Sequence, residues 1–411
     1  MKFSHDSNMP AQTIASTDRP ARIRALAGAR ALPPLVLVLF HYCEGHGYRH
    51  FWPLDLVVAR GYLWVEFFFA LSGFVLMHVH GARQAELLTG AGWGAFLRAR
   101  LIRLYPLHLF LLLVMLGIVI GLDALAWHGG YHSIFQVRYH QDVSVKGFVL
   151  SLLLLHAWNT MDRLTWNTVS WFVSVELALC LVFPLLAALA KGRPWRGLAF
   201  VAAGVAGLWA LDITSPHGLD ITYHDGVLRG LSDFAIGIGM AVLYGACKPR
   251  DKLPAAAHSA IQAALVAWLF YAFYHTGWSH TRADIWVALP MLALVPALAF
   301  DRGIVAAALG ARLPQRLGDW SYAIYLGQTT WLLVIRFFEQ RIYPAHGDMV
   351  LGRHFIDLIW WLEPALLVLV CAGWGAVLTR WIERPAAAFL KARLDPGGAP
   401  ASLSPRPRRL S

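Results

Sequence analysis

Long apolar runs alternate with short polar connections along almost the whole chain. A helix that crosses a bilayer needs about 20 consecutive, mostly apolar residues. Ten runs meet this requirement, with approximate limits 24–44, 61–80, 101–122, 168–190, 197–213, 227–246, 255–275, 284–300, 320–340 and 358–381. An eleventh run, Phe148 to Trp158, is too short to cross, and we expect a re-entrant or interfacial helix there on the outer side. The pattern predicts an all-α, polytopic integral membrane bundle with about ten transmembrane helices.

The composition excludes an ordinary soluble domain. Hydrophobic residues make up 58% of the 411 residues and charged residues only 14%, whereas soluble domains carry about 25% charged residues. The net charge of +11 could indicate nucleic-acid binding. Here it is spread over short loops between apolar runs, so we expect a lipid bilayer around the chain and no nucleic-acid partner. The four cysteines have no paired spacing and indicate neither disulfides nor zinc.

The lysines and arginines predict the orientation of the chain. Short loops rich in these residues lie on the cytoplasmic side of a membrane. With the N-terminus inside, every inner loop is basic and most of the positive charge lies inside. If the short run at Phe148 crossed, this asymmetry would be lost. An even number of spans is therefore expected, with both termini in the cytoplasm.

The two ends of the chain differ from its middle. Residues 1–20 are polar and contain no apolar signal-peptide segment, so we expect a disordered cytoplasmic N-terminus. Residues 395–411 are rich in Pro, Gly, Ser and Arg, a composition typical of a disordered tail. A single transmembrane domain, residues 21–394, is expected between them.

The first predicted span contains two ionisable residues, Arg30 and His41. Such groups are costly inside a membrane and are usually functional. Eleven residues are close to three helical turns, so the two side chains are expected on one face, roughly 16 Å apart along the axis. A buried histidine can be a hydrogen-bonded core residue, but an imidazole can also take a proton from a hydroxyl near neutral pH. Glu44, one turn further on, either orients it or lies in a wet loop.

The third and fourth spans carry further charged residues. Arg100 and Arg103 are three residues apart and share a helix face. They either fix the topology or clamp the phosphates of a cytosolic ligand, because guanidinium groups match phosphate. Glu176 lies within an apolar helix that also carries Asn167 and Trp171 near its start. A carboxylate at that position needs a partner or a proton, and Arg229 and His41 are the two candidates.

The ninth span has polar positions suited to lining a cavity or to hydrogen bonding between helices. They are Ser321, Tyr322, Tyr325 and Gln328. Most histidines lie in the predicted outer loops, but their spacing matches no ligand set, so no metal site is expected.

Taken together, these segments resemble the acyltransferase-3 family of polytopic membrane proteins, from about Arg22 to about Arg393. The family's motifs are matched in order, Arg-x10-His by Arg30 and His41, FFxLSGFL by a stretch ending in Ser72, Gly73 and Phe74, RxxRLYP by Arg100, Arg103, Tyr105 and Pro106, NxxxWSLxxE by Asn167, Trp171 and Glu176, RxxxFxxG by Arg229, Phe234 and Gly237, and E-[RK]-P by Glu383, Arg384 and Pro385. Two departures stand out. Gln328 replaces the usual histidine of SYxxYLxH, and Phe172 and Val173 replace the Ser and Leu of WSL.

The resemblance implies an O-acyltransferase of the bacterial cytoplasmic membrane that modifies envelope carbohydrate. It implies acyl-CoA, with acetyl-CoA as the default, as a co-substrate bound from the cytosol, and no permanently bound cofactor. The expected partners are the carbohydrate acceptor, the bilayer and proteins of polysaccharide biosynthesis. His41 would act as general base or transient acyl carrier and Arg30 would position the donor. Arg100 and Arg103 would hold the CoA phosphates, and Glu176 would tune His41 or pair with an arginine.

Two other classes of protein fit the same polar residues. A proton-coupled transporter or exporter of a small solute could use His41 and Glu176 as a proton relay. A non-catalytic partner of a polysaccharide assembly machine could carry the same helices, and the replacement at Gln328 keeps that alternative open.

Overall fold

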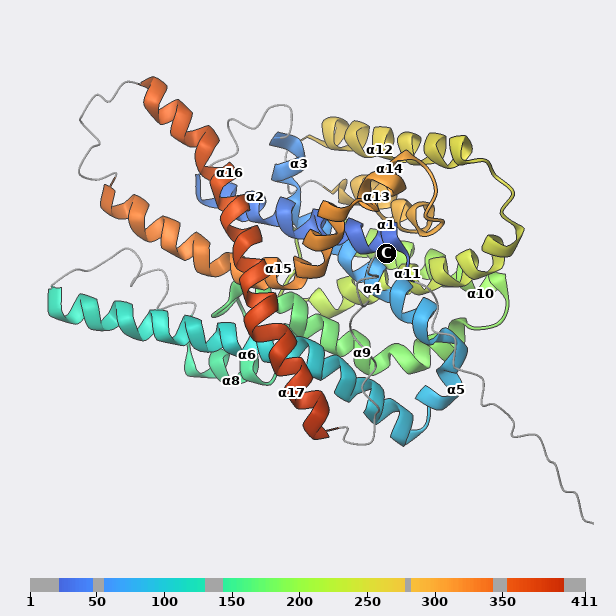
Figure 1. Ribbon diagram of the computed structural model, residues 1–411, viewed down its shortest axis with the longest axis horizontal. Coiled ribbons are helices and arrows are strands. Elements are labelled where there is room, and N and C mark those ends of the chain that lie inside the picture. The colour runs from blue at the N-terminus through green and yellow to red at the C-terminus, as the bar shows by residue number, and fades with distance from the viewer. Residues whose placement is uncertain (1–21, 47–54, 130–142, 278–281, 343–352, 395–411) are drawn as a thin grey trace, which may run out of the picture.

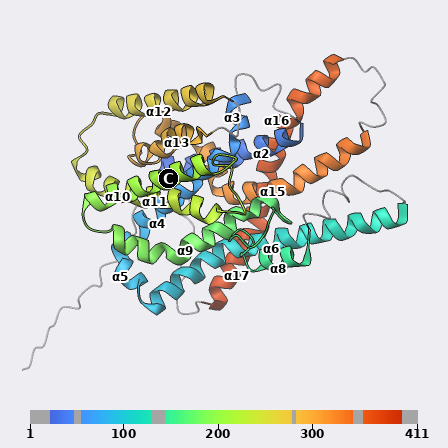
Figure 2. The ribbon, with the colours of Figure 1, turned by 180° about the vertical axis from the view of Figure 1, so that it is seen from behind.

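The computed structural model describes residues 22–46, 55–129, 143–277, 282–342 and 353–394. Within these ranges the regular structure is helical, with no strand. Most of the long helices run side by side, while α16 and α17 form one long rod that crosses them obliquely (Figures 1 and 2). The predicted disordered ends, residues 1–20 and 395–411, lie outside the described residues.

The helices follow one another without any intervening β-structure in the described chain. Their bounds are α1 (Arg24–Ala29), α2 (Leu32–His46), α3 (Asp55–Ala59), α4 (Trp64–His80), α5 (Gln84–Leu87), α6 (Gly90–Gly129), α8 (Val145–Leu152), α9 (Trp171–Ala190), α10 (Pro194–Thr214), α11 (Gly226–Cys247), α12 (Ala255–Thr276), α13 (Asp284–Ala299), α14 (Ile304–Leu309), α15 (Arg312–Ile342), α16 (Arg353–Leu378) and α17 (Arg384–Leu394). Short 3-10 turns cover Gly61–Leu63, Gly81–Arg83, Thr168–Ser170 and Lys248–Arg250, and a π-helical turn covers Thr379–Glu383.

Eight helical segments in the described ranges are long and apolar enough to cross a membrane, and each of them overlaps a predicted span. They cover Arg24–Glu44, Gly61–Leu87, Gly90–Gly121, Thr168–Ala190, Pro194–Thr214, Gly226–Arg250, Ala255–Thr276 and Leu362–Leu394. The predicted span at 284–300 is the shorter α13, of 16 residues. The predicted span at 320–340 belongs to α15, which begins with a polar stretch from Arg312 to Asp319. A multi-pass helical membrane protein is confirmed, while the count of ten and the orientation stay predictions.

Helix α11 lies at the centre of the bundle, packed against α4, α9 and α10. Small residues allow α4 and α11 to approach closely. A side chain at Gly73 would collide with the backbone carbonyl of Phe234, and one at Gly237 would collide with that of Ala70. Close contact through small residues is a common way for membrane helices to pack. The glycines of two family motifs are therefore packing residues that join α4 to α11.

The first predicted span is not one continuous helix. It breaks at Arg30 and Ala31, between α1 and α2. Pro33 and Pro34 explain the break, because proline has no N–H to donate to the preceding helical turn. Helix α1 packs on α14 and α15, whereas α2 packs on α15 and α16. The prediction that a single helix holds Arg30 and His41 in register was wrong.

The short apolar run after residue 143 forms α8, a helix of only eight residues. The chain then turns and lies against α9. The backbone N–H of Ala157 donates to Ser174 Oγ at 3.2 Å, and the Trp158 indole N–H donates to the Ser174 carbonyl at 3.0 Å. This geometry agrees with the prediction that the run does not cross the membrane.

Candidate functional site

His41 and Gln328 form a hydrogen-bonded pair between α2 and α15. Nδ1 of His41 lies 3.2 Å from Oε1 of Gln328, and Nε2 of Gln328 donates to the Tyr325 carbonyl at 2.9 Å. Since the amide N–H group is directed to a carbonyl, the amide oxygen faces the imidazole. Nδ1 must then carry the proton, and in the neutral ring Nε2 is the basic nitrogen. The residue that departs from the family pattern thus sets the tautomer of His41.

His41 lines a cavity of about 570 Å³, which we call the histidine cavity. Its walls come from α2, the turn before α4, the segment leading into α9, the α10–α11 connection and α15. They combine aromatic, charged and hydroxyl side chains. The polar and aromatic lining residues are Phe40, His41, Glu44, Tyr62, Thr168, Trp171, His217, Asp220, Thr222, Tyr223, Arg229, Tyr325 and Thr329.

Four arginines, Arg22, Arg30, Arg100 and Arg103, line a second region, which we call the basic cavity. It consists of a space of about 440 Å³ and an adjoining space of about 100 Å³. The two spaces share Arg30, Arg103, Ser321 and Tyr322 in their walls. Arg100 lines the smaller space, and Arg103 is exposed. The arginines of two family motifs, from α1–α2 and from α6, therefore meet in one cavity.

Glu176 lies in the smaller part of the basic cavity and is only 7% exposed. Its Oε1 accepts a hydrogen bond of 2.6 Å from Ser72 Oγ. Neither predicted partner was right. Arg229 pairs with Glu66 at 2.7 Å, where both side chains are fully buried, and His41 pairs with Gln328. Glu176 instead lines the basic cavity beside its arginines, and Asp319 and Glu383 are further acidic residues in the wall of that cavity.

Three aromatic rings pack together where the histidine cavity and the basic cavity share a lining residue. The ring of Tyr325 packs edge-on against Phe68 and Phe172, with centroid distances of 6.1 and 5.4 Å. Tyr325 lines both cavities, and the two phenylalanines line the basic one. We call these three residues the aromatic septum. Arg30 and His41, predicted to share one polar face, line different cavities, the basic cavity and the histidine cavity.

The other predicted cavity residues have mixed roles. Trp171 lines the histidine cavity, with the Arg229 guanidinium 5.6 Å from its ring centroid. Ser321 and Tyr322 line the basic cavity, where the Tyr322 hydroxyl donates to the Leu104 carbonyl at 2.6 Å. Asn167 is a buried link between segments. It donates to the Leu326 carbonyl at 3.1 Å and accepts from the Thr329 hydroxyl at 2.9 Å.

Some residues of the site were not singled out by sequence reasoning. Ser72 was noted only as part of a motif, although it donates to Glu176. Glu66 lies in α4 at the start of the same stretch and was given no role, although a carboxylate within an apolar run is a detectable signal. The residues 217–223 were noted only for their histidine, because their position on the cavity wall depends on the fold.

The fold and the site define a multi-pass membrane protein in which a histidine and a group of arginines occupy two adjoining cavities. The acyltransferase domain of the acyltransferase-3 family matches residues 23–380, so the chain belongs to this family and is an acyltransferase. The resemblance inferred from the motifs is confirmed.

Two relatives show how far the similarity extends. Acyltransferase MdmB of Streptomyces mycarofaciens is 26% identical over 408 residues, which cover 93% of this chain and 96% of the relative. Protein 2 in picA locus of Rhizobium radiobacter is 38% identical over 110 residues, which cover 27% of this chain and 52% of that protein. No solved structure matches the chain.

Proposed function

We propose that this enzyme moves an acyl group, with acetyl as the default, from cytosolic acyl-CoA to a hydroxyl of a cell-envelope or exported carbohydrate. It would act in the bacterial cytoplasmic membrane with both termini inside, beside partners of polysaccharide biosynthesis. One observation carries this proposal. A basic cavity and a histidine cavity meet at the aromatic septum, so a donor and an acceptor can approach one point from two sides.

The donor belongs in the basic cavity. Coenzyme A carries several phosphate negative charges, and guanidinium groups bind phosphate through paired hydrogen bonds. Arg103 is exposed and lines both spaces of this cavity, whereas Arg100 lines only the smaller space. Glu176 offsets part of the positive charge and so reduces the repulsion between the arginines. Acyl-CoA is a co-substrate that comes and goes, and no permanently bound cofactor is proposed.

The acceptor belongs in the histidine cavity, where His41 acts as general base. Nε2 of His41 takes the proton of the acceptor hydroxyl as its oxygen attacks the thioester carbonyl. The new C–O bond forms, the C–S bond breaks, and the thiolate leaves as coenzyme A thiol after taking up the proton. Gln328 accepts a hydrogen bond from Nδ1–H. It thereby stabilises the imidazolium that exists after the proton leaves the acceptor hydroxyl and before it reaches the thiolate.

Transfer of a labelled acyl group in membrane vesicles provides the direct test. Inverted membrane vesicles carrying the protein are supplied with acyl-labelled acetyl-CoA and an envelope glycan extract, and label in the glycan is followed. We expect transfer by the wild type and none above background by vesicles with His41→Ala. If the wild type transfers no label from acetyl-CoA or succinyl-CoA to any glycan fraction, the proposed donor and acceptor are wrong.

Arg103→Ala is expected to weaken donor binding. Loss of a hydrogen bond between two charged groups costs about 1.5–3 kcal/mol, so the KM for acetyl-CoA should rise about 10- to 100-fold. Arg98→Ala is the matched control, because Arg98 is exposed on the same helix and lines neither cavity. Equal KM values for the two variants would exclude Arg103 from the donor site.

Tyr325→Trp is expected to slow transfer without weakening donor binding. Tyr325 is 2% exposed, so a larger indole ring would thicken the septum between the two cavities. The kcat should fall about tenfold or more, while the KM for acetyl-CoA stays close to that of the wild type. Tyr271→Trp on the exposed face of α12 is the control. An unchanged kcat in the septum variant would show that the acyl group does not pass this point.

A further inference from the structure

The connection between α10 and α11, residues 215–225, contributes four side chains to the histidine cavity wall. His217, Asp220, Thr222 and Tyr223 all line the cavity that holds His41. We call residues 215–225 the acceptor loop, for the role argued below. A connection that supplies four polar lining side chains does more than join two helices.

Buried charges hold the backbone of this loop in place. Asp284 accepts a hydrogen bond of 2.9 Å from the Leu219 N–H. Arg229 donates to the Ile221 carbonyl at 2.7 Å. Both charged side chains are fully buried. Burying a charge inside a membrane domain is costly unless the charge is paired. Each of these two buried groups also makes a hydrogen bond to the backbone of the loop.

The two charges are themselves fixed by partners on other segments. Asp284 pairs with Arg60 and accepts from the Tyr62 hydroxyl at 2.9 Å. Arg229 pairs with Glu66 at 2.7 Å and donates to the Tyr62 carbonyl at 2.9 Å. The loop is therefore anchored to a buried network that joins α11, α13 and the segment that starts α4.

The end of the loop next to α11 is hydrogen-bonded to the connection between α8 and α9. Asn159 and Asp225 exchange hydrogen bonds. The Asn159 amide group donates to the Asp225 carboxylate at 3.1 Å, and the Asp225 N–H donates to the Asn159 side-chain oxygen at 2.8 Å. The Asn159 N–H also donates to the Tyr223 carbonyl at 3.3 Å. A loop held at both edges presents its side chains without a large loss of conformational entropy on binding.

The chemistry of these side chains suits a polyhydroxylated ligand. A carboxylate accepts hydrogen bonds from hydroxyl groups, and hydroxyl and imidazole groups donate or accept. Trp171 adds part of an aromatic ring to the wall of the same cavity, against which the C–H face of a sugar ring can pack. The cavity volume of about 570 Å³ is in the range of small-molecule sites.

We propose that residues 215–225 are the acceptor-recognition loop of this enzyme. Asp220 and His217 select a polyhydroxylated acceptor and position one of its hydroxyls for His41, and the buried pairs at Arg229 and Asp284 keep the loop in its binding geometry. This inference rests on the proposed function, because it assumes that the acceptor enters the histidine cavity.

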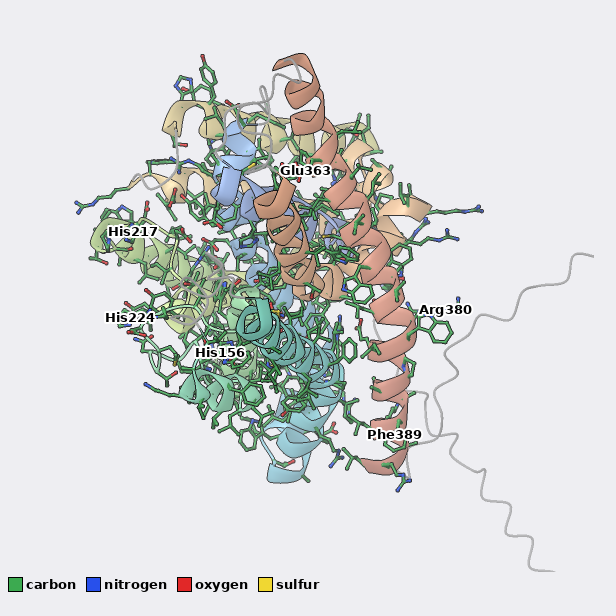
Figure 3. The ribbon with its side chains drawn as sticks, turned by 90° about the vertical axis from the view of Figure 1, so that its left-hand side faces the viewer. His156, His217, His224, Glu363, Arg380 and Phe389 are labelled. Atoms are coloured by element: carbon green, nitrogen blue, oxygen red, sulfur yellow. The ribbon has the colours of Figure 1, made fainter. Side chains whose placement is uncertain are left out.

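The chain provides a matched pair of histidines for the test. His217 lines the histidine cavity, whereas His224 lies on the same loop but lines a separate surface hollow, with its side chain 69% exposed. Both lie on the side of the molecule opposite to Arg380 and Phe389 (Figure 3). The variants are His217→Ala, Asp220→Asn and, as control, His224→Ala. Each purified protein is checked for a single peak in gel filtration.

Two measurements are made on each variant. Competition between glycan fractions for labelled acetyl-CoA gives the acceptor preference, and binding of the preferred glycan without donor gives its Kd. We expect His217→Ala and Asp220→Asn to raise the Kd at least about tenfold and to change the preference, while His224→Ala matches the wild type. The inference is overturned if all three variants match the wild type.

The two proposals fail in distinguishable ways. If the wild type binds glycan but transfers no acyl group, the donor assignment is wrong and the Kd values still test the loop. If the wild type transfers acyl groups and the loop variants keep its acceptor preference, the proposed function stands and the loop assignment is wrong. If the wild type neither binds nor acylates any glycan, both are wrong.

Discussion

His41→Ala is expected to lower the acyl-transfer rate by about 10²- to 10⁴-fold, which is the contribution of a well-placed general base. The substitution removes the imidazole ring that Gln328 orients through Nδ1, and alanine cannot take a proton from the acceptor hydroxyl. The measurement is the initial rate of label transfer at matched expression in membrane vesicles. The KM for acetyl-CoA should change little, because the donor is proposed to bind on the other side of the septum.

A histidine control separates this effect from a general loss of fold. His275 is exposed on α12 and packs against Tyr271, so His275→Ala should behave as the wild type.

Gln328→Leu tests the hydrogen bond between His41 and Gln328. It removes the acceptor for Nδ1–H, and a smaller loss with an altered pH–rate profile is expected. Retention of more than about a tenth of the activity by His41→Ala would rule out its role as the general base.

Glu66→Ala is expected to cause the largest loss of stability of any single substitution considered for this chain. Glu66 and Arg229 are fully buried and pair at 2.7 Å. Removing one partner of a buried ion pair leaves the other charge unpaired and costs about 3–5 kcal/mol. Arg229 also carries a hydrogen bond to the loop at Ile221, so the histidine cavity should lose its shape. Thermal unfolding in detergent, followed by gel filtration, measures the effect.

Glu86 supplies the matched control. It pairs with Arg83 at 2.6 Å, but both side chains are more than half exposed. Exposed ion pairs contribute about 0–1 kcal/mol, so Glu86→Ala should unfold close to the wild-type temperature. The double variant Glu66→Leu with Arg229→Met removes both buried charges and should regain much of the lost stability. If Glu66→Ala and Glu86→Ala unfold at the same temperature, the buried pair does not stabilise the fold.

Hydropathy alone predicted most of the membrane helices, because the requirement of about 20 apolar residues is a property of local sequence. It was less informative at α15, where the polar residues from Arg312 to Asp319 belong to the same helix as the apolar ones. It also missed the break between α1 and α2. Two adjacent prolines, Pro33 and Pro34, were a visible signal for that break.

The site was only partly predictable, because its contacts join distant segments. The motifs identified His41, Arg100, Arg103 and Glu176, but local spacing cannot say which side chain faces which. Ser72 meets Glu176 over a separation of 104 residues. The partner of His41 was within reach of reasoning, because Gln328 stands where the family has histidine, and an amide there can still bind an imidazole.

The aromatic septum has a consequence for how well the protein keeps ions from crossing the membrane. The histidine cavity and the basic cavity share Tyr325 in their walls, and Phe68 and Phe172 pack against its ring. Across a membrane that holds an electrical potential, moving one elementary charge through 100 mV releases about 2.3 kcal/mol. If acyl transfer takes place across these rings, as proposed, they must admit a small, neutral acyl group while they block protons and other ions. Ion leakage through the protein is then a property to measure beside its transfer rate.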